Sequence, residues 1–201
     1  MLKYLLLGSL VLASLFLKAC APKAQEDCGF LQNVYGERIS WKSSVPVTIE
    51  LHESVPDSYI PAIVASLNEW EVNAGRRLFN LVTSPRVRGP QNPQKDGRNI
   101  IYFMSSWESN RVSEQGRTNL YWVGDEIKEA DIRINNSGTY SFYYGSGSGV
   151  NFQALMTHEL GHVLGLKHRD SGGSVMGTYL ANNVDRVALA ETDSVALSCE
   201  Y

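Results

Sequence analysis

Three of the chain's four histidines lie close together, and their spacing is that of ligands to a single metal ion. On an α-helix, His158 and His162 would stand one turn apart on the same face, so both imidazoles could reach one ion at about 2.0–2.1 Å. Glu159 follows the first histidine and lies beside the ligand face, where a carboxylate can address a water on the metal. The segment therefore predicts a metal centre with a general base next to it.

His168 is the third ligand that this prediction requires. A helix continued past His162 would place His168 about 240° around the axis and roughly 9 Å along it, out of reach of the same ion. Gly165 lies between them and can adopt the left-handed conformation that ends a helix and turns the chain back. Three neutral nitrogen ligands leave a fourth position for water, which is the arrangement of a catalytic zinc. A zinc-bound water ionises near pH 7, and the same ion can polarise a peptide carbonyl.

The plainer explanation of His-Glu-x-x-His alone is an exposed helix face, but the third histidine and the glycine favour zinc. The fourth histidine, His52, is expected to be a surface or hydrogen-bonded side chain and no ligand.

The elements that must position these residues suggest an α+β domain, with strands and one helix before the metal helix. A first helix should begin after Asp57 or Ser58, as its cap, and end at Gly75, because Ile63, Leu67 and Trp70 repeat at helical spacing. A long loop is expected from Thr83 to Gly97, and a terminal helix from Val187 to Leu197. Alternation and β-branched content predict strands at Val45 to Leu51, Asn99 to Met104, Thr118 to Val123, Ala130 to Ile134 and Tyr140 to Tyr144.

Composition indicates one globular domain. The chain has 201 residues, of which 43% are hydrophobic and 19% charged. Its net charge of −3 and pI near 5.8 provide no basic surface, which argues against a nucleic-acid partner.

The N-terminus has the pattern of an export signal. Lys3 precedes an apolar run from Leu5 to Leu17 that is too short to span a bilayer, and small residues follow. The box Leu17-Lys18-Ala19-Cys20 resembles a bacterial lipoprotein signal, which would lipidate Cys20 and anchor the protein to a membrane. Ordinary cleavage after Ala19-Cys20-Ala21 is the alternative. We therefore expect a signal at 1–19, a tether and lead-in at 20–44 and the domain at 45–201, in an outer-membrane lipoprotein or a secreted protein.

Two cysteines remain if Cys20 carries lipid. Cys28 and Cys199 lie near the two ends of the mature chain, and an exported protein can pair them. Two unpaired thiols are the alternative.

The segment from His158 to His168 resembles the zinc signature of the metzincins, and Ser174-Val175-Met176 resembles their Met-turn. Gly161, the strand Ala130 to Ile134 and Thr192-Asp193 are most similar to the matrixins among them. The resemblance implies a mixed, twisted sheet of about five strands, an active-site helix and a C-terminal helix. It also implies a monomeric zinc endopeptidase acting on proteins or peptides, with Met176 as an apolar floor under the ligands.

Several positions depart from the matrixin pattern. The segment from Pro85 to Pro90 lacks the cysteine that confers latency, and the histidines of a second, structural zinc are missing, so one zinc is expected. Tyr179 follows Met176 by three residues, whereas the tyrosine that approaches the metal in astacin-like enzymes follows by two, which favours a wall of the substrate pocket or a core position over a role at the metal. Calcium stays open, because the acidic side chains that could bind it are scattered in loops, at Asp96, Asp125, Glu126 and Asp170.

The expected mechanism places an extended peptide along an exposed edge strand, for which Ala130 to Ile134 is the candidate, with Ile132 and Ile134 as candidate pocket residues. Glu159 would take a proton from the attacking water and pass it to the leaving amine. Two other functions remain open: a non-catalytic zinc-binding surface lipoprotein, and a metallohydrolase of cell-wall peptides.

Overall fold

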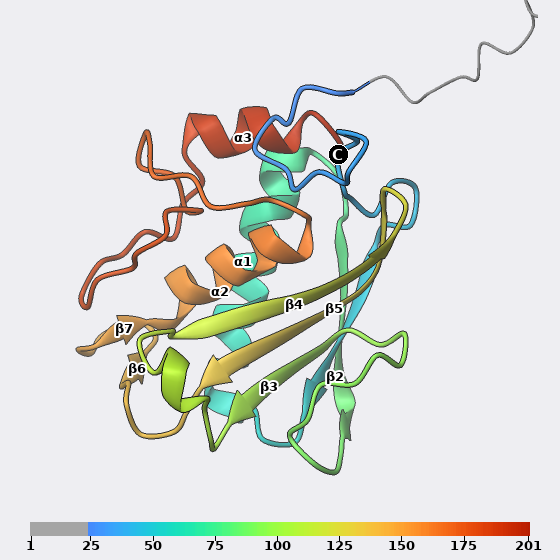
Figure 1. Cartoon of the computed structure of the whole chain (residues 1–201). Helices are drawn as coiled ribbons and strands as arrows, with labels where there is room; N and C mark the ends of the chain where they lie inside the picture. The colour runs from blue at the N-terminus through green and yellow to red at the C-terminus, as the bar shows by residue number, and fades with distance from the viewer. Residues whose placement is uncertain (1–23) are drawn as a thin grey trace, which may run out of the picture.

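The computed structural model describes residues 24–201; residues 1–23, which include the predicted signal and Cys20, lie outside the described part. In Figure 1 the sheet forms one layer and the helices α1 and α2 lie together on one of its faces. The α-helices are α1 (Ile60–Ala74), α2 (Phe152–Val163) and α3 (Glu191–Leu197), with 3-10 turns at Asp57–Tyr59 and Ser109–Arg111. The strands are β1 (Val47–His52), β2 (Phe79–Val87), β3 (Ile100–Met104), β4 (Gly116–Val123), β5 (Glu126–Asn135), β6 (Phe142–Tyr143) and β7 (Val150–Asn151).

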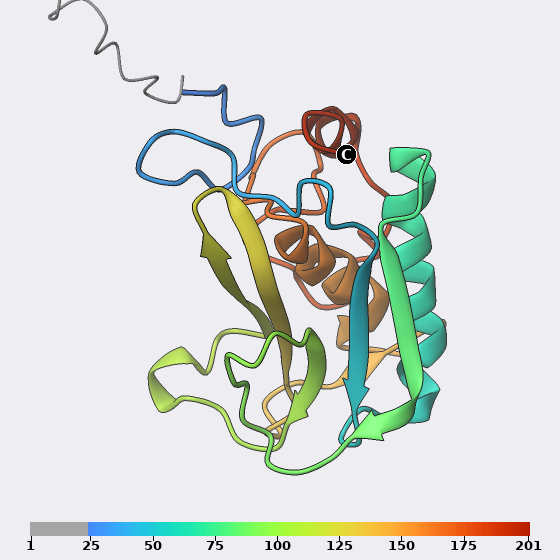
Figure 2. The ribbon, with the colours of Figure 1, turned by 90° about the vertical axis from the view of Figure 1, so that its right-hand side faces the viewer.

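The main sheet has five strands in the order β2-β1-β3-β5-β4. Its first four strands run parallel, and β4 pairs antiparallel with β5 at the edge beside α2. The view turned by 90° shows the twist of this sheet (Figure 2). The predicted α+β class and the mixed, five-stranded sheet are confirmed.

The prediction that Ala130 to Ile134 forms an exposed edge is wrong. This segment lies in β5, whose backbone pairs with β3 on one side and with β4 on the other. Because both sides of β5 are paired, a peptide cannot add to it. The edge strand of the sheet nearest α2 is β4.

Strand β2 was not predicted, and its second half falls in the stretch expected to be a loop. Phe79, Leu81 and Val82 pair in register with β1, and the strand continues through Pro85. Proline is tolerated here because β2 is an edge strand, on which a missing N–H breaks no ladder. Pro85 therefore argued against a strand in the sequence, although the position of β2 at the edge of the sheet allows one.

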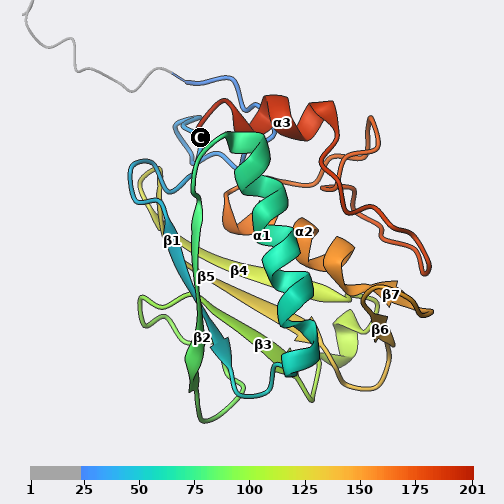
Figure 3. The same ribbon diagram turned by 180° about the vertical axis from the view of Figure 1, so that it is seen from behind.

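Helix α1 packs along α2 through hydrogen bonds as well as apolar contacts. The fully buried Trp70 donates its indole N–H to the Thr157 carbonyl of α2 at 2.9 Å. Gly75, with φ 63°, ends α1 as predicted, but the helix begins at Ile60 after a 3-10 turn, and neither Asp57 nor Ser58 caps it. Figure 3, seen from behind, shows α1 lying along the sheet with α3 across its end.

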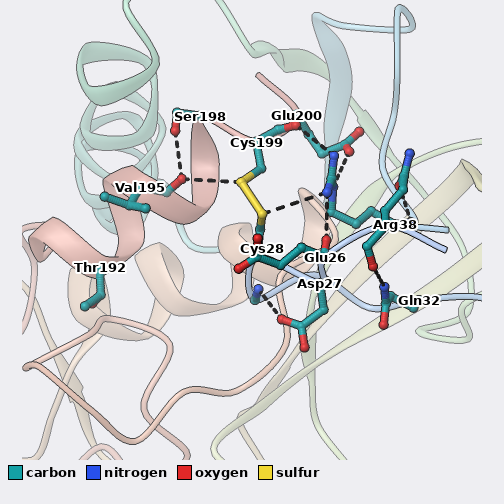
Figure 4. Close-up of a disulfide and its surroundings, with 12 residues drawn as sticks. Glu26, Asp27, Cys28, Gln32, Arg38, Thr192, Val195, Ser198, Cys199 and Glu200 are labelled. Atoms are coloured by element: carbon teal, nitrogen blue, oxygen red, sulfur yellow. Dashed lines mark hydrogen bonds and ion pairs between the residues drawn. A yellow bond between two sulfur atoms is a disulfide. The ribbon is translucent and has the colours of Figure 1, made fainter. Parts of the chain in front are cut away.

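The segment before β1 is part of the packed domain. Phe30, Ile39 and Trp41 are buried in the same core as the sheet and the helices. Of the stretch expected as a tether and lead-in, residues 28–44 are therefore integral to the fold, and the domain begins before residue 45. A disulfide between Cys28 and Cys199 joins this segment to the chain after α3 (Figure 4).

No helix within residues 24–201 is long and apolar enough to cross a membrane.

Candidate metal centre

Helix α2 presents the first two histidines. The Asn151 side chain caps its start by accepting the Ala154 N–H at 3.1 Å. The Nε2 atoms of His158 and His162, one turn apart, lie 3.1 Å from each other. Helix α2 therefore presents both imidazoles on one face, as their i, i+4 spacing predicted.

The helix ends at the glycine that the sequence singled out. Gly165 has φ 100°, and its N–H donates to the His162 carbonyl at 2.9 Å while the Leu166 N–H donates to the Gly161 carbonyl at 3.0 Å. This pair of bonds is the Schellman arrangement that closes a helix on a left-handed residue. A Cβ at Gly165 would also collide with the Ile39 carbonyl, so both the conformation and the close contact require glycine.

The reversed chain brings His168 to the other two histidines. Its Nε2 lies 3.1 Å from that of His162 and 3.3 Å from that of His158. Four tetrahedral bonds of about 2.0–2.1 Å place the nitrogens of a zinc site about 3.3–3.4 Å apart. The three imidazoles therefore have the separation that one zinc ion requires, and they are the one group of three or more potential ligands found in residues 24–201.

Hydrogen bonds on the far side of two rings decide which nitrogens are free for a metal. The Nδ1 atoms of His158 and His162 lie 2.8 Å from the carbonyls of Val175 and Leu166. A carbonyl only accepts, so each Nδ1 carries the proton and each Nε2 offers a lone pair. Burial, the main cause, lowers the pKa of His158 to about 3 and that of His162 to about 4, which keeps both rings neutral. Converging lone pairs without protons between them fit a cation.

The turn below the histidines is held by α3. Met176 is buried against α2, and a Cβ at Gly161 would overlap its Sδ, so the glycine lets the turn approach the helix. The buried carboxylate of Asp193 accepts the Val175 N–H at 2.9 Å and the Ser174 hydroxyl. Met176 thus packs against the ligand helix at Gly161, and its place as a floor under the imidazoles stays a prediction.

Glu159 lies at the inner wall of the site, next to the edge strand. The Thr118 hydroxyl of β4 donates to its Oε2 at 2.7 Å, and a Cβ at Gly116 would come within 2.8 Å of its Oε1. Burial raises the pKa of Glu159 to about 7, because water no longer solvates its charge. The carboxyl can therefore exchange a proton near neutral pH.

A cleft of about 1120 Å³ passes over the three histidines and Glu159. Strand β4 forms one wall, from Gly116 to Leu120, and Gly177 to Leu180 line the opposite side. Tyr179 lines this cleft and is 77% exposed, which agrees with a pocket wall. The assignment of Ile132 and Ile134 to the pocket is wrong, because both point into the core between sheet and helices and are at most 1% exposed.

Three residues of the site, Gly116, Thr118 and Arg186, were missed from the sequence, and Asp170 was considered there only for calcium. Gly116 and Thr118 contact Glu159 across the fold, as described above. Asp170 accepts the Thr178 N–H at 2.6 Å, and Arg186 donates to the Tyr179 carbonyl at 3.2 Å, so together they hold the far wall of the cleft. These contacts join segments distant in sequence or lie in irregular loops, and no spacing pattern signals them.

The remaining candidate residues lie away from the histidines. His52 is buried, and its ring nitrogens contact the Ser54 hydroxyl at 2.8 Å and the Gly89 carbonyl at 3.1 Å, so it is a hydrogen-bonded core residue as predicted. Asp125 pairs with Lys42, and Glu126 with Lys128. Calcium binding by the loop acids stays an open prediction, and Cys20 lies outside the described residues.

Comparisons with known proteins agree with this geometry. The chain is 48% identical to feline matrilysin over 50 residues, which cover 24% of the chain and 19% of matrilysin. It is 24% identical to human matrix metalloproteinase-25 over 143 residues, which cover 68% of the chain and 24% of that protein. The chain thus spans about a quarter or less of each relative. The sequence model of the matrixin family matches residues 95–201, more than half of the chain, with the three histidines, Glu159 and Met176 inside the match. The chain therefore belongs to the matrixins, a family of zinc metallopeptidases.

Proposed function

We propose that this chain is a zinc endopeptidase that hydrolyses peptide bonds in proteins, with Glu159 as its general base and one zinc held by His158, His162 and His168. The observation that carries the proposal is the convergence of the Nε2 atoms of three histidines in one cleft, beside a carboxyl whose pKa is raised to about 7. Two of these nitrogens, those of His158 and His162, are free of protons because the Nδ1 atoms of the same rings donate to carbonyls. Zinc, when bound, supplies a Lewis acid that polarises the scissile carbonyl and acidifies an attacking water.

The edge strand β4 is the place for an extended substrate. Its inner edge pairs with β5, and its residues from Gly116 to Leu120 line the cleft. A peptide that adds to this edge gains main-chain hydrogen bonds whatever its sequence, while side-chain pockets select what it carries. This arrangement supports a protein or peptide as substrate and replaces the predicted role of Ala130 to Ile134.

Glu159 has the placement that proton transfer needs. Its Oε2 is held by Thr118, which restricts the rotamer and leaves the carboxyl oriented along the cleft wall. Its raised pKa lets it accept a proton from the attacking water and deliver the proton to the leaving amine at neutral pH. A zinc site that only binds metal has no use for a carboxyl at this position.

The test is Glu159→Gln in the full mature chain. The amide keeps the size of the side chain and can still accept from Thr118, but it cannot take a proton. We expect cleavage of a denatured protein to fall by at least about 100-fold, with the zinc content unchanged. Glu37→Gln is the matched control, because Glu37 bonds to Asn33 in the N-terminal segment.

The result separates this proposal from its rivals. Retained cleavage in Glu159→Gln would refute the general-base role. A wild-type protein that binds zinc yet cleaves no protein would indicate a zinc-binding lipoprotein. Turnover of cell-wall peptides alone would indicate a hydrolase of that substrate class.

We also propose that the protein is exported and acts as a monomer. The Cys28–Cys199 disulfide supports export, because such bonds persist mainly in oxidising compartments. Lipid attachment at Cys20, with residues 1–19 removed, is proposed from the signal pattern and is tested by mass spectrometry of the mature N-terminus.

A further inference from the structure

Of the three histidines, His168 is held least by hydrogen bonds of its own side chain. His158 and His162 each hold a backbone carbonyl through Nδ1. His168 is exposed, and among residues 24–201 the hydrogen-bond-distance contacts of its ring are those with the other two imidazoles. Its position in the zinc site therefore depends on the backbone of the turn that leads to it, residues 164–168.

The N-terminal segment binds this turn directly. The Leu31 N–H donates to the Gly165 carbonyl at 2.9 Å, and the Lys167 N–H donates to the Gly29 carbonyl at 2.8 Å, around an antiparallel bridge of Phe30 and Leu166. The residue before His168 is thus hydrogen-bonded to the residue after Cys28. The turn leading to the third ligand and the N-terminal segment therefore pair like two short antiparallel strands.

The C-terminal segment binds the same turn from another side. The Tyr201 hydroxyl donates to the Leu164 carbonyl at 2.7 Å, two residues after Cys199 in the chain. In Figure 4 the disulfide joins the two segments, and Arg38 beside it donates to the Glu26 and Cys199 carbonyls at 2.7 and 3.3 Å. The covalent bond therefore links the two segments that hold the turn.

We infer that the Cys28–Cys199 disulfide is a positioning element for the third zinc ligand, so that zinc affinity depends on this bond. The inference rests on the zinc site of the proposed function. Without the bond, the contact of residues 29–31 with the turn depends only on hydrogen bonds and on the packing of Phe30, so this contact opens locally more often. Each opening frees the 164–168 turn and removes one of three protein ligands.

The experiment compares the wild type with the double variant Cys28→Ala and Cys199→Ala, in which neither position carries a thiol that could bind zinc. Zinc affinity is measured by competition with a chelator, at a temperature where circular dichroism shows both proteins folded. We expect affinity to fall about 10- to 100-fold, the range for loss of a group that orients a metal ligand. The visible spectrum of the Co²⁺-substituted variant should shift toward that of His168→Ala.

A matched control separates positioning from general stability. Ile49 lies in β1, outside both segments, and Ile49→Ala removes buried volume and lowers the free energy of unfolding. Wild-type affinity and an unchanged Co²⁺ spectrum in the double-alanine variant would overturn the inference. Equal weakening in Ile49→Ala would overturn it as well, because zinc would then follow stability alone.

A milder variant decides the matter if the double variant does not fold. Asp27 accepts the Gly29 N–H at 2.7 Å and the Lys167 ammonium at 2.8 Å, and Asp27→Ala removes both while keeping the disulfide. We expect a weakening of a few-fold in zinc affinity, and no change would contradict the inference. If His168→Ala binds zinc as tightly as the wild type, the zinc site itself is wrong, which is a failure of the proposed function and is recognised as such.

Discussion

Asp193 of α3 holds the turn beneath the histidines, and its loss should weaken both the fold and the metal site. Its buried carboxylate accepts the Val175 N–H at 2.9 Å, the Ala190 N–H at 3.0 Å and the Ser174 hydroxyl. Asp193→Ala removes the acceptor and leaves three donors unpaired, of which two are buried and the Ala190 N–H is half-buried. Because each such donor costs about 1–3 kcal/mol, we expect the free energy of unfolding to fall by at least about 3 kcal/mol.

The effect should reach the zinc through one residue. The Val175 carbonyl accepts from Nδ1 of His158 at 2.8 Å, so a turn that loses its hold on Val175 also loses its hold on the first ligand. We expect zinc affinity to fall by about tenfold or more. The melting temperature should fall by roughly 6–12 °C, since each kcal/mol corresponds to about 2–4 °C in a domain of this size.

Urea unfolding of the metal-free protein and chelator competition measure the two effects separately. Glu191→Ala is the control, because Glu191 lies exposed in the first turn of the same helix and should change the free energy of unfolding by less than about 0.5 kcal/mol. Asp193→Asn keeps one acceptor oxygen, so its free energy of unfolding should lie between those of Asp193→Ala and Glu191→Ala. An Asp193→Ala protein within about 1 kcal/mol of the wild type, with unchanged zinc affinity, would refute this reasoning.

Two further substitutions test the packing of α2 and the titration of the sheet. Gly161→Ala would force a Cβ against Met176 Sδ and Trp70, and urea unfolding should show a loss of about 1–3 kcal/mol; an unchanged midpoint would contradict the contact. Burial, followed by the charge of Glu129, raises the pKa of Asp131 to about 7, so the folded state holds a proton that the unfolded state releases above about pH 4. The wild type therefore loses the stability that this group contributes as pH rises from about 4 toward 7. The free energy of unfolding of Asp131→Asn minus that of the wild type should be larger at pH 8 than at pH 5. A constant difference between the two proteins would show that Asp131 does not titrate in this way.

Local spacing was enough to predict the metal ligands and the helix that carries two of them. His158 and His162 share a helix face because of the 3.6-residue repeat, and Gly165 ends that helix because only glycine adopts its conformation at little cost. These are properties of a few consecutive residues. The strands β1, β3, β4 and β5 also followed from alternation, although their ends differed by a few residues.

The order of the strands was decided only in three dimensions. Alternation marks Ala130 to Ile134 as a strand, but it does not say which strands lie on either side, and β5 proved to be interior. The same limit hid β2, whose proline is compatible with a strand only at an edge. Which edge a substrate can use is therefore a property of the sheet and not of any one segment.

The supports of the site were likewise beyond the sequence. Thr118 and Gly116 contact Glu159 across about 40 residues of chain, and the hydrogen bond of Leu31 to Gly165 spans more than a hundred residues. Such contacts depend on how whole elements pack, because side chains distant in sequence meet only after the core has formed. The three metal ligands and the general base thus lie within eleven consecutive residues, whereas the contacts that hold them in place come from both ends of the chain.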